Sequence, residues 1–260
     1  MDAVNRSRHI AGRGPSAQAW LQDAALAAVA PIDFDTLIPA GARVVVVAPH
    51  PDDEILTCGA LLQLAAQRGA APLIVAVTDG EASHPGSPAW PPERLRLARA
   101  RETGAALECL GIDATRVQRL GIPDGGVSAQ EEALAQRLAA IIQPGDVVVT
   151  TWCFDGHPDH EATARACLAA ASACGARTLE APVWGWHWSA PNDGAMPLAY
   201  ARRLSLPEAV LARKRAAMAC FQSQVLPDAS RGAAPVVPPQ ALDRVLTPFE
   251  LFFHDPARPF

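Results

Sequence analysis

The sequence predicts an α/β protein in which a mostly parallel central sheet is covered by helices on both faces, a three-layer, Rossmann-like arrangement. Four valines stand in a row at 44–47, and such runs are typical of strands buried on both faces. Each of four apolar runs is followed by a segment with the apolar spacing of a helix. This alternation at short spacing favours parallel strands joined by right-handed crossovers.

The four strand-and-helix units can be followed along the chain. The helix after the valines has its apolar residues on one face, and Gly69 is suited to end it. Gly111 follows the second helix, and Pro144-Gly145 closes the third. In chain order the predicted strands are 43–48, 72–78, 117–120 and 146–151, and the predicted helices are 55–68, 93–110, 131–142 and 161–174.

Outside these units the pattern is weaker. Residues 1–16 predict a loose polar arm, and the alanine-rich stretch 17–30 predicts a helix that ends at Pro31. No clear linker divides the chain, so residues 1–40 are expected to be an N-terminal arm and helix of the same domain as residues 41–260. The other predicted elements are a half-buried strand with alternating tryptophans over 181–189, a helix over 207–224, a loop over 227–239 and an edge strand over 249–253.

Composition narrows the class of protein. Half of the 260 residues are hydrophobic, enough for a substantial core, and the net charge of −5 gives no case for binding nucleic acid or an anionic membrane. No apolar run approaches the roughly 20 residues of a spanning helix, and the first 15 residues lack the apolar core of a secretory signal. The six cysteines form no CxxC pair and are expected to be reduced thiols of a cytoplasmic protein.

Histidines and acidic residues gather at two predicted strand ends. In open α/β sheets ligands bind at the carboxyl ends of strands, so neighbouring strands would bring both clusters into one crevice. Two histidines and one carboxylate, with water at the remaining position, is the usual composition of a catalytic zinc site. A further carboxylate could act as general base on the bound water. The clusters are His50-Pro51-Asp52-Asp53-Glu54 and His157-Pro158-Asp159-His160.

Each cluster also has an ordinary structural explanation. An aspartate before a helix is a common N-cap, and His160 could be a surface residue of the helix that follows. These explanations stay open for either cluster alone. Two matching clusters at corresponding strand ends are much harder to explain as coincidence.

The two clusters resemble the motifs of a known family, the LmbE-like, or PIG-L, N-acetylglucosaminyl deacetylases. Residues 49–54 match its HPDDE signature, and residues 156–160 match its second motif, GHPDH. The resemblance spans residues 44–224, and the paired motifs are its most specific part. Weaker matches are Arg99 and Glu102 before Leu110-Gly111, residues 120–125, and Arg213-Lys214 before Ser223-Gln224.

The resemblance implies a zinc centre. His50, Asp53 and His160 would bind Zn²⁺, and Asp52 would be the general base that takes a proton from the metal-bound water. Fe²⁺ or Co²⁺ would also suit two histidines and one carboxylate. Glu54 would support the first turn of the helix.

The resemblance also implies roles around the metal. His157 would stabilise the oxyanion or protonate the leaving amine, with Asp159 hydrogen-bonded to hold its orientation and raise its pKa. Arg99 and Asp124 would touch the substrate, although a helix-surface arginine and a turn aspartate remain equally good explanations. The sequence departs from some sugar deacetylases at Asp155, where those enzymes have a mobile tyrosine. That difference puts their exact substrate in doubt.

These features predict a zinc-dependent amide hydrolase that removes an N-acyl group, with acetyl the expected one, from an amino sugar or a sugar-containing small molecule. One alternative is an amidase that acts on a thiol conjugate or another acylated metabolite with the same metal site. Another is a binding module that has lost turnover. A nucleotide-binding domain is disfavoured because no GxGxxG or Walker A sequence is present, and a serine hydrolase because G-x-S-x-G is absent. The sequence leaves open whether the chain forms a homo-oligomer, and what the tryptophans at 184–188 and the loop 79–92 do.

Overall fold

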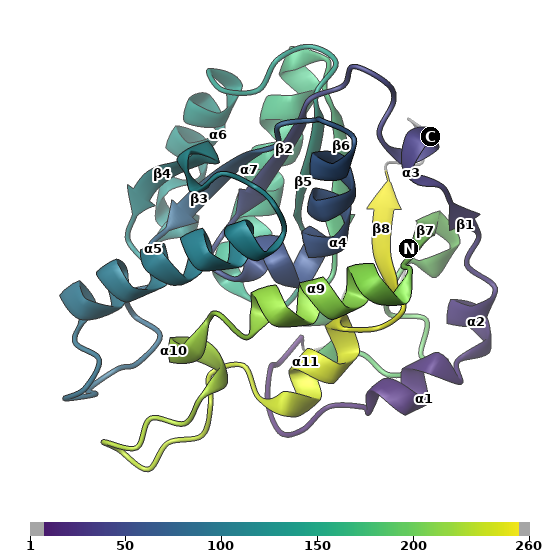
Figure 1. The fold of residues 1–260 in the computed structure, drawn as a ribbon. Coiled ribbons are helices and arrows are strands. Elements are labelled where there is room, and N and C mark those ends of the chain that lie inside the picture. The colour runs from purple at the N-terminus through teal and green to yellow at the C-terminus, as the bar shows by residue number, and fades with distance from the viewer. Residues whose placement is uncertain (1–7, 255–260) are drawn as a thin grey trace.

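A computed structural model describes residues 8–254, and within them eight strands form one sheet. The strands are β1 (Pro31–Ile32), β2 (Val44–Ala48), β3 (Leu73–Thr78), β4 (Val117–Ile122), β5 (Val147–Thr151), β6 (Arg177–Ala181), β7 (Ala201–Ser205) and β8 (Phe249–His254). Their spatial order is β1-β7-β8-β6-β5-β2-β3-β4 (Figure 1). β8 is antiparallel to both of its neighbours, and the other paired strands are parallel. The predicted α/β fold with a mostly parallel sheet is confirmed.

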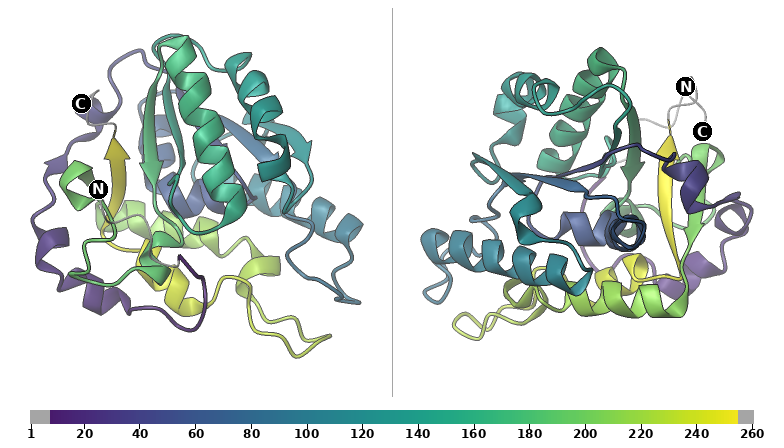
Figure 2. Two further views of the ribbon diagram at one scale, coloured as in Figure 1. Left: turned by 180° about the vertical axis from the view of Figure 1, so that it is seen from behind. Right: turned by 45° about the horizontal axis from the view of Figure 1, so that its top comes forward.

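Helices cover both faces of the sheet, as the views from the front and from behind show (Figures 1 and 2). The α-helices are α1 (Ala17–Leu21), α2 (Ala24–Ala27), α3 (Phe34–Leu37), α4 (Asp53–Gln67), α5 (Pro92–Cys109), α6 (Glu131–Ala139), α7 (Pro158–Cys174), α8 (Gly185–Trp188), α9 (Glu208–Met218), α10 (Gln222–Val225) and α11 (Pro239–Val245). Short 3-10 turns are η1 (Ala114–Arg116), η2 (Val127–Gln130) and η3 (Leu198–Tyr200).

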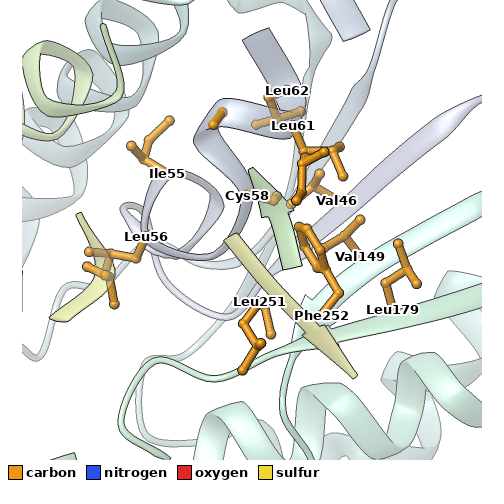
Figure 3. Packing of buried hydrophobic residues seen from close by; sticks show 14 of the residues in the cluster. Val46, Ile55, Leu56, Cys58, Leu61, Leu62, Val149, Leu179, Leu251 and Phe252 are labelled. Atoms are coloured by element: carbon orange, nitrogen blue, oxygen red, sulfur yellow. The ribbon is translucent and has the colours of Figure 1, made fainter. Parts of the chain in front are cut away.

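The valine run of β2 explains the three layers. Successive side chains of a strand point to opposite faces, so Val44 and Val46 pack into the core that contains α4, α5 and α9, whereas Val45 and Val47 pack into the core that contains α6 and α7. All four valines are buried. Figure 3 shows Val46 beside Cys58 and Leu61 of α4. A strand that is apolar on both faces therefore sits between two helix layers.

The register of the sheet brings the two polar clusters together. β2 pairs in parallel with β5, and Val47 lies opposite Thr150. The carboxyl ends of both strands therefore lie side by side, where the chain turns into α4 after β2 and toward α7 after β5. The carboxyl ends of the strands are the place at which α/β sheets bind ligands.

Three predictions about secondary structure after residue 180 were wrong. The tryptophan-rich stretch 181–189 is not a strand, because β6 ends at Ala181 and the chain turns into α8. The last strand is not an edge strand, because β7 and β1 extend the sheet beyond it. The predicted helix 207–224 is divided into α9 and α10.

The N-terminal part of the chain packs on this same sheet. β1 pairs with β7, and the indole N–H of Trp20 donates to the backbone carbonyl of Trp186 at 3.0 Å. The predicted helix 17–30 is two short helices, because Asp23 caps the start of α2. Of the predicted loose arm, residues 1–7 lie outside the described residues. Between residues 8 and 254, no helix has both the length and the apolar character needed to cross a bilayer.

Candidate active site

The structure brings His50, Asp53 and His160 together at the ends of β2 and β5. Nδ1 of His50 lies 3.2 Å from Oδ2 of Asp53 and 3.3 Å from Nε2 of His160, and that Nε2 lies 3.2 Å from the same Asp53 oxygen. All three residues are buried. Asp53 also accepts the backbone N–H of His50 at 3.0 Å, so the turn itself helps to hold this carboxylate.

These three atoms fit a divalent metal ion. Zinc binds imidazole nitrogen at about 2.0–2.1 Å, so the donor atoms of a tetrahedral site lie about 3.3 Å apart. The three observed separations of 3.2 to 3.3 Å match that spacing. Two further groups, His50 with His157 and His160, and His50 with Asp124 and Asp159, also place their ligand atoms within 4.8 Å of one another. The donor set therefore suits a metal with mixed nitrogen and oxygen ligands.

Carboxylates lie behind both histidines of this group. Nε2 of His50 is 3.1 Å from Oδ1 of Asp124 and 3.4 Å from Oδ2 of Asp159. Nδ1 of His160 is 2.8 Å from Oδ2 of Asp155. Burial opposes the charged imidazole of His160, but Asp53 and Asp155 together raise its pKa to about 9. A carboxylate on the outer nitrogen fixes the tautomer and the ring orientation of a metal-binding histidine.

Asp155 is a site residue whose function the sequence did not indicate. Its side chain is fully buried, and its oxygens accept the backbone N–H groups of Val183 (2.9 Å), Trp184 (3.0 Å) and Gly185 (2.8 Å) besides contacting His160. It therefore faces inward toward the histidine. In the sequence, only its position, five residues before the second histidine of the HPDH motif, could have indicated this role.

Asp52 occupies the N-cap position of α4 without acting as a cap. Its φ of 131° is rare for a residue other than glycine, and in the described part of the chain its side chain makes no capping hydrogen bond. The backbone N–H of Asp52 donates to Oε2 of Glu54 at 3.0 Å, which supports the strained turn. Burial raises the pKa of Asp52 to about 7, although the nearby Arg99 opposes this shift.

Arg99 of α5 binds the turn between β2 and α4. The residue is only 2% exposed, and its guanidinium donates to the carbonyl oxygens of Gly80 and Pro51 and lies 3.3 Å from Oδ2 of Asp52. A Cβ at position 80 would collide with the guanidinium, and Gly80 has φ +66°. Glycine is therefore required there. The Nε of Arg99 is buried and has no hydrogen-bond partner within residues 8–254.

The backbone of Asp159 holds the ring of His157. Its Nδ1 accepts the backbone N–H of Asp159 at 3.2 Å, so its proton is on Nε2. Burial, together with the neighbouring His160 and His50, lowers the pKa of His157 to about 3. The Asp159 carboxylate favours a higher pKa for His157, but burial and the two histidines outweigh it. That carboxylate accepts the N–H groups of Gly125 (2.7 Å) and Val127 (3.2 Å) and faces His50.

Comparison with known proteins identifies the domain. Residues 45–171 match the family described as PIG-L, GlcNAc-PI de-N-acetylase. The chain carries a PIG-L domain. It is also 30% identical, over 196 residues, to a 1D-myo-inositol 2-acetamido-2-deoxy-alpha-D-glucopyranoside deacetylase of Mycolicibacterium gilvum (strain PYR-GCK), covering 64% of this chain and 65% of the relative. A protein of the same name from Kineococcus radiotolerans is 30% identical over 50% of this chain and 45% of that protein. The chain thus matches less than two thirds of the length of either relative.

Solved structures show the same fold. The conserved protein TT1542 from Thermus thermophilus superposes with a TM-score of 0.58 at 26% identity, covering 82% of this chain and 94% of the other. A deacetylase–teicoplanin complex from the biosynthesis pathway of teicoplanin gives a TM-score of 0.59 at 24% identity, covering 71% of this chain and 88% of the other. The second similarity shows the fold alone.

A pocket with a volume of about 220 Å³ lies above the histidines, and residues within and after the matched range line it. Every site residue named from the sequence lines it except Asp159, which lies directly behind His50. Arg99 and Asp124 are thus placed to meet a substrate, and that contact stays a prediction. The sequence assigned no site role to several other lining residues, which come from distant segments: Leu56, Ala82, Ser83, Gly125, Gln224, Val236 and Val237.

The tryptophans of 184–188 divide between the pocket and the core. Trp184 lines the pocket. Trp186 is 5% exposed and packs edge-on against Trp20, with ring centroids 5.2 Å apart. Trp188 stacks on Trp152 at 5.8 Å. The tryptophan group therefore contributes Trp184 to the wall of the pocket, while the other two are structural.

Proposed function

We propose that this chain is a zinc-dependent, cytoplasmic hydrolase that removes an N-acyl group, with acetyl the expected one, from an amino sugar or a sugar-containing small molecule. The PIG-L domain and the names of the two relatives, both deacetylases of an acetylated glucosaminide, support this activity. The six cysteines are free thiols, which agrees with a reducing compartment.

The observation that carries the proposal is the spacing of three ligand atoms, with the carboxylate of Asp52 beside them and not among them. His50, Asp53 and His160 present their donors 3.2 to 3.3 Å apart. Asp52 lines the same pocket and caps no helix. Two histidines, one carboxylate and a free carboxylate form the minimal set for metal-assisted hydrolysis.

Each residue has a separate part in the proposed reaction. A bound divalent metal supplies Lewis acidity to the amide carbonyl and lowers the pKa of water to about 7. Asp52 accepts the proton of the attacking water on its carboxylate, and Arg99, 3.3 Å away, holds that carboxylate in place. His157 is neutral and carries its proton on Nε2, so it can donate a hydrogen bond to the oxyanion that develops on the carbonyl.

The walls of the pocket support a sugar as the substrate. Trp184 offers an apolar face, while Arg99, Asp124, Ser83 and Gln224 offer polar groups. A ring that presents both hydroxyl groups and C–H faces would satisfy both kinds of wall.

The test combines metal analysis with a substrate panel. Purified protein should contain about one divalent ion per chain, with zinc giving the highest turnover among zinc, Fe²⁺ and Co²⁺. N-acetylglucosaminides should be hydrolysed faster than thiol-conjugate amides. The proposal is wrong if the protein binds no divalent metal. Faster turnover of conjugate amides would instead favour the amidase, and bound metal with no turnover across the panel would favour a binding module.

A further inference from the structure

Helix α4 is broken close to the proposed metal-binding residues. Cys58 has non-helical backbone angles, φ −146° and ψ 26°, which separate the turn that begins at Asp53 from the rest of the helix. Such a break leaves N–H groups on one side and carbonyl groups on the other without partners inside the helix. Because the break is buried, these groups need partners from elsewhere in the protein.

Two buried side chains of opposite charge supply those partners. The two carboxylate oxygens of Glu250, in β8, accept the backbone N–H groups of Ala60 at 2.8 Å and Leu61 at 2.9 Å. Nζ of Lys214, in α9, donates to the carbonyl oxygen of Leu56 at 3.1 Å and to Glu250 at 2.7 Å. Lys214 is 0% exposed and Glu250 is 3% exposed. The pair therefore caps both sides of the break.

The segment around the break packs closely against this pair. A Cβ at Gly59 would lie 3.1 Å from Cγ2 of Ile55, which is a tight contact, and 3.4 Å from Cγ of Lys214, which is an ordinary one. Glu250 and Phe252 lie two residues apart and share one face of β8. Figure 3 shows the Phe252 ring beneath Cys58. β8 therefore presents its carboxylate to the point where the helix breaks.

We propose that Lys214 and Glu250 are positioning residues for the metal site, which hold the break in α4 and so place Asp53 among the ligands and Leu56 in the pocket wall. This inference rests on the proposed function, because Asp53 is a metal ligand only within it. A buried ion pair adds little net stability compared with apolar side chains of similar size, because both charges lose their hydration. A geometric role therefore explains this pair better than stability does.

Glu250→Gln tests the role with a matched control. The amide keeps the shape of the carboxylate but offers only one acceptor oxygen for two N–H groups. We expect the dissociation constant for zinc, measured by chelator competition, to rise about tenfold or more, as for other residues that support metal ligands. The control is Asp146→Asn. Asp146 is also buried, accepts the backbone N–H of Gln143 at 2.7 Å and pairs with the Arg43 guanidinium at 2.5 Å. Because Asp146 precedes β5, at the amino ends of the strands and away from the site, the substitution should lower the melting temperature and leave zinc affinity unchanged.

Hydrogen exchange gives a second readout, which does not depend on the metal. In the metal-free protein, the amides of residues 53–62 should exchange faster in Glu250→Gln than in wild type, whereas Asp146→Asn should leave them unchanged. The inference is wrong if Glu250→Gln lowers stability as the control does but keeps the zinc affinity of wild type. It is equally wrong if exchange at 53–57 does not change.

Two further outcomes, an unfolded variant and a wild type without zinc, can also be interpreted. If Glu250→Gln does not fold, Gly59→Ala crowds Ile55 at the break without removing either charge of the pair, and the same two readouts decide. If wild type binds no zinc, the proposed function fails, whereas exchange at residues 53–57 still shows whether the pair positions that turn.

Discussion

The carboxylate of Asp155 lies 2.8 Å from Nδ1 of His160, on the side of the ring opposite the Nε2 atom that faces Asp53. The same carboxylate binds three backbone N–H groups at the start of the turn into α8. One buried side chain therefore orients a proposed metal ligand and also shapes the wall that carries Trp184.

Asp155→Asn should weaken zinc binding by about 10–100-fold, the usual cost of losing a carboxylate behind a metal-binding histidine. The amide can still accept some of the N–H groups, so the fold should persist. Competition with a chelator measures the effect. Asp35→Asn, at a carboxylate whose side chain is 77% exposed, is the control and should bind zinc like wild type. Equal affinities in the two variants would show that Asp155 does not orient His160.

Asp52→Asn should reduce kcat by about 10²–10⁴-fold, the contribution of a positioned general base. Asparagine has the shape of the aspartate that already adopts this φ, so the strained turn should survive the change. Bound zinc should stay near one ion per chain, because Asp52 is not among the three proposed ligands. The measurement is steady-state kinetics together with metal analysis. Turnover within threefold of wild type would remove Asp52 from the proposed role.

Trp184 and Trp186 form a matched pair that separates recognition from stability. Trp184→Ala should raise KM about tenfold with a small change in melting temperature, because the residue lines the pocket and is only partly buried. Trp186→Ala should cost about 3–5 kcal/mol of unfolding free energy, because it leaves a cavity in the core beside Trp20. Kinetics and thermal unfolding of both variants check this. The opposite pattern would contradict the division of the tryptophans between pocket and core.

Thiol chemistry should distinguish Cys167 from Cys174, which lie on the same helix. Burial raises the pKa of Cys167 to about 12, so its thiolate is scarce at any pH between 7 and 9. Cys174 is partly exposed. Alkylation with iodoacetamide, followed by mass spectrometry, should modify Cys174 and leave Cys167 intact throughout that pH range. Both should react in denaturant, and rapid modification of Cys167 in the folded protein would contradict its burial.

Much of the site was predictable because its residues are neighbours in the sequence. The valine run indicated a strand buried on both faces, and the His-Pro-Asp repeats marked two strand ends. The structure joins these ends through the pairing of β2 with β5 and brings His50, Asp53 and His160 within 3.3 Å of one another. The chemical roles of these residues remain predictions.

The wrong predictions depend on contacts between distant segments. Tryptophans at every second position predicted a strand at 181–189. However, the backbone N–H groups of Val183, Trp184 and Gly185 donate to Asp155 and not to a neighbouring strand. Similarly, whether β8 lies at an edge depends on its pairing with β7, nearly fifty residues earlier. Local spacing carries no information about either partner.

The sequence by itself determined the alternation of strands and helices, the buried character of β2 and β5, and the composition of both polar clusters, because backbone preference and hydrophobic period are local properties. Only the tertiary structure decided that Asp155 faces His160, that Asp159 faces His50, and that Lys214 and Glu250 cap a break in α4. These contacts join residues from separate elements. The cluster His50–Glu54 is thus a local motif whose geometry is held by side chains from β8, α5, α9 and the turn after β5.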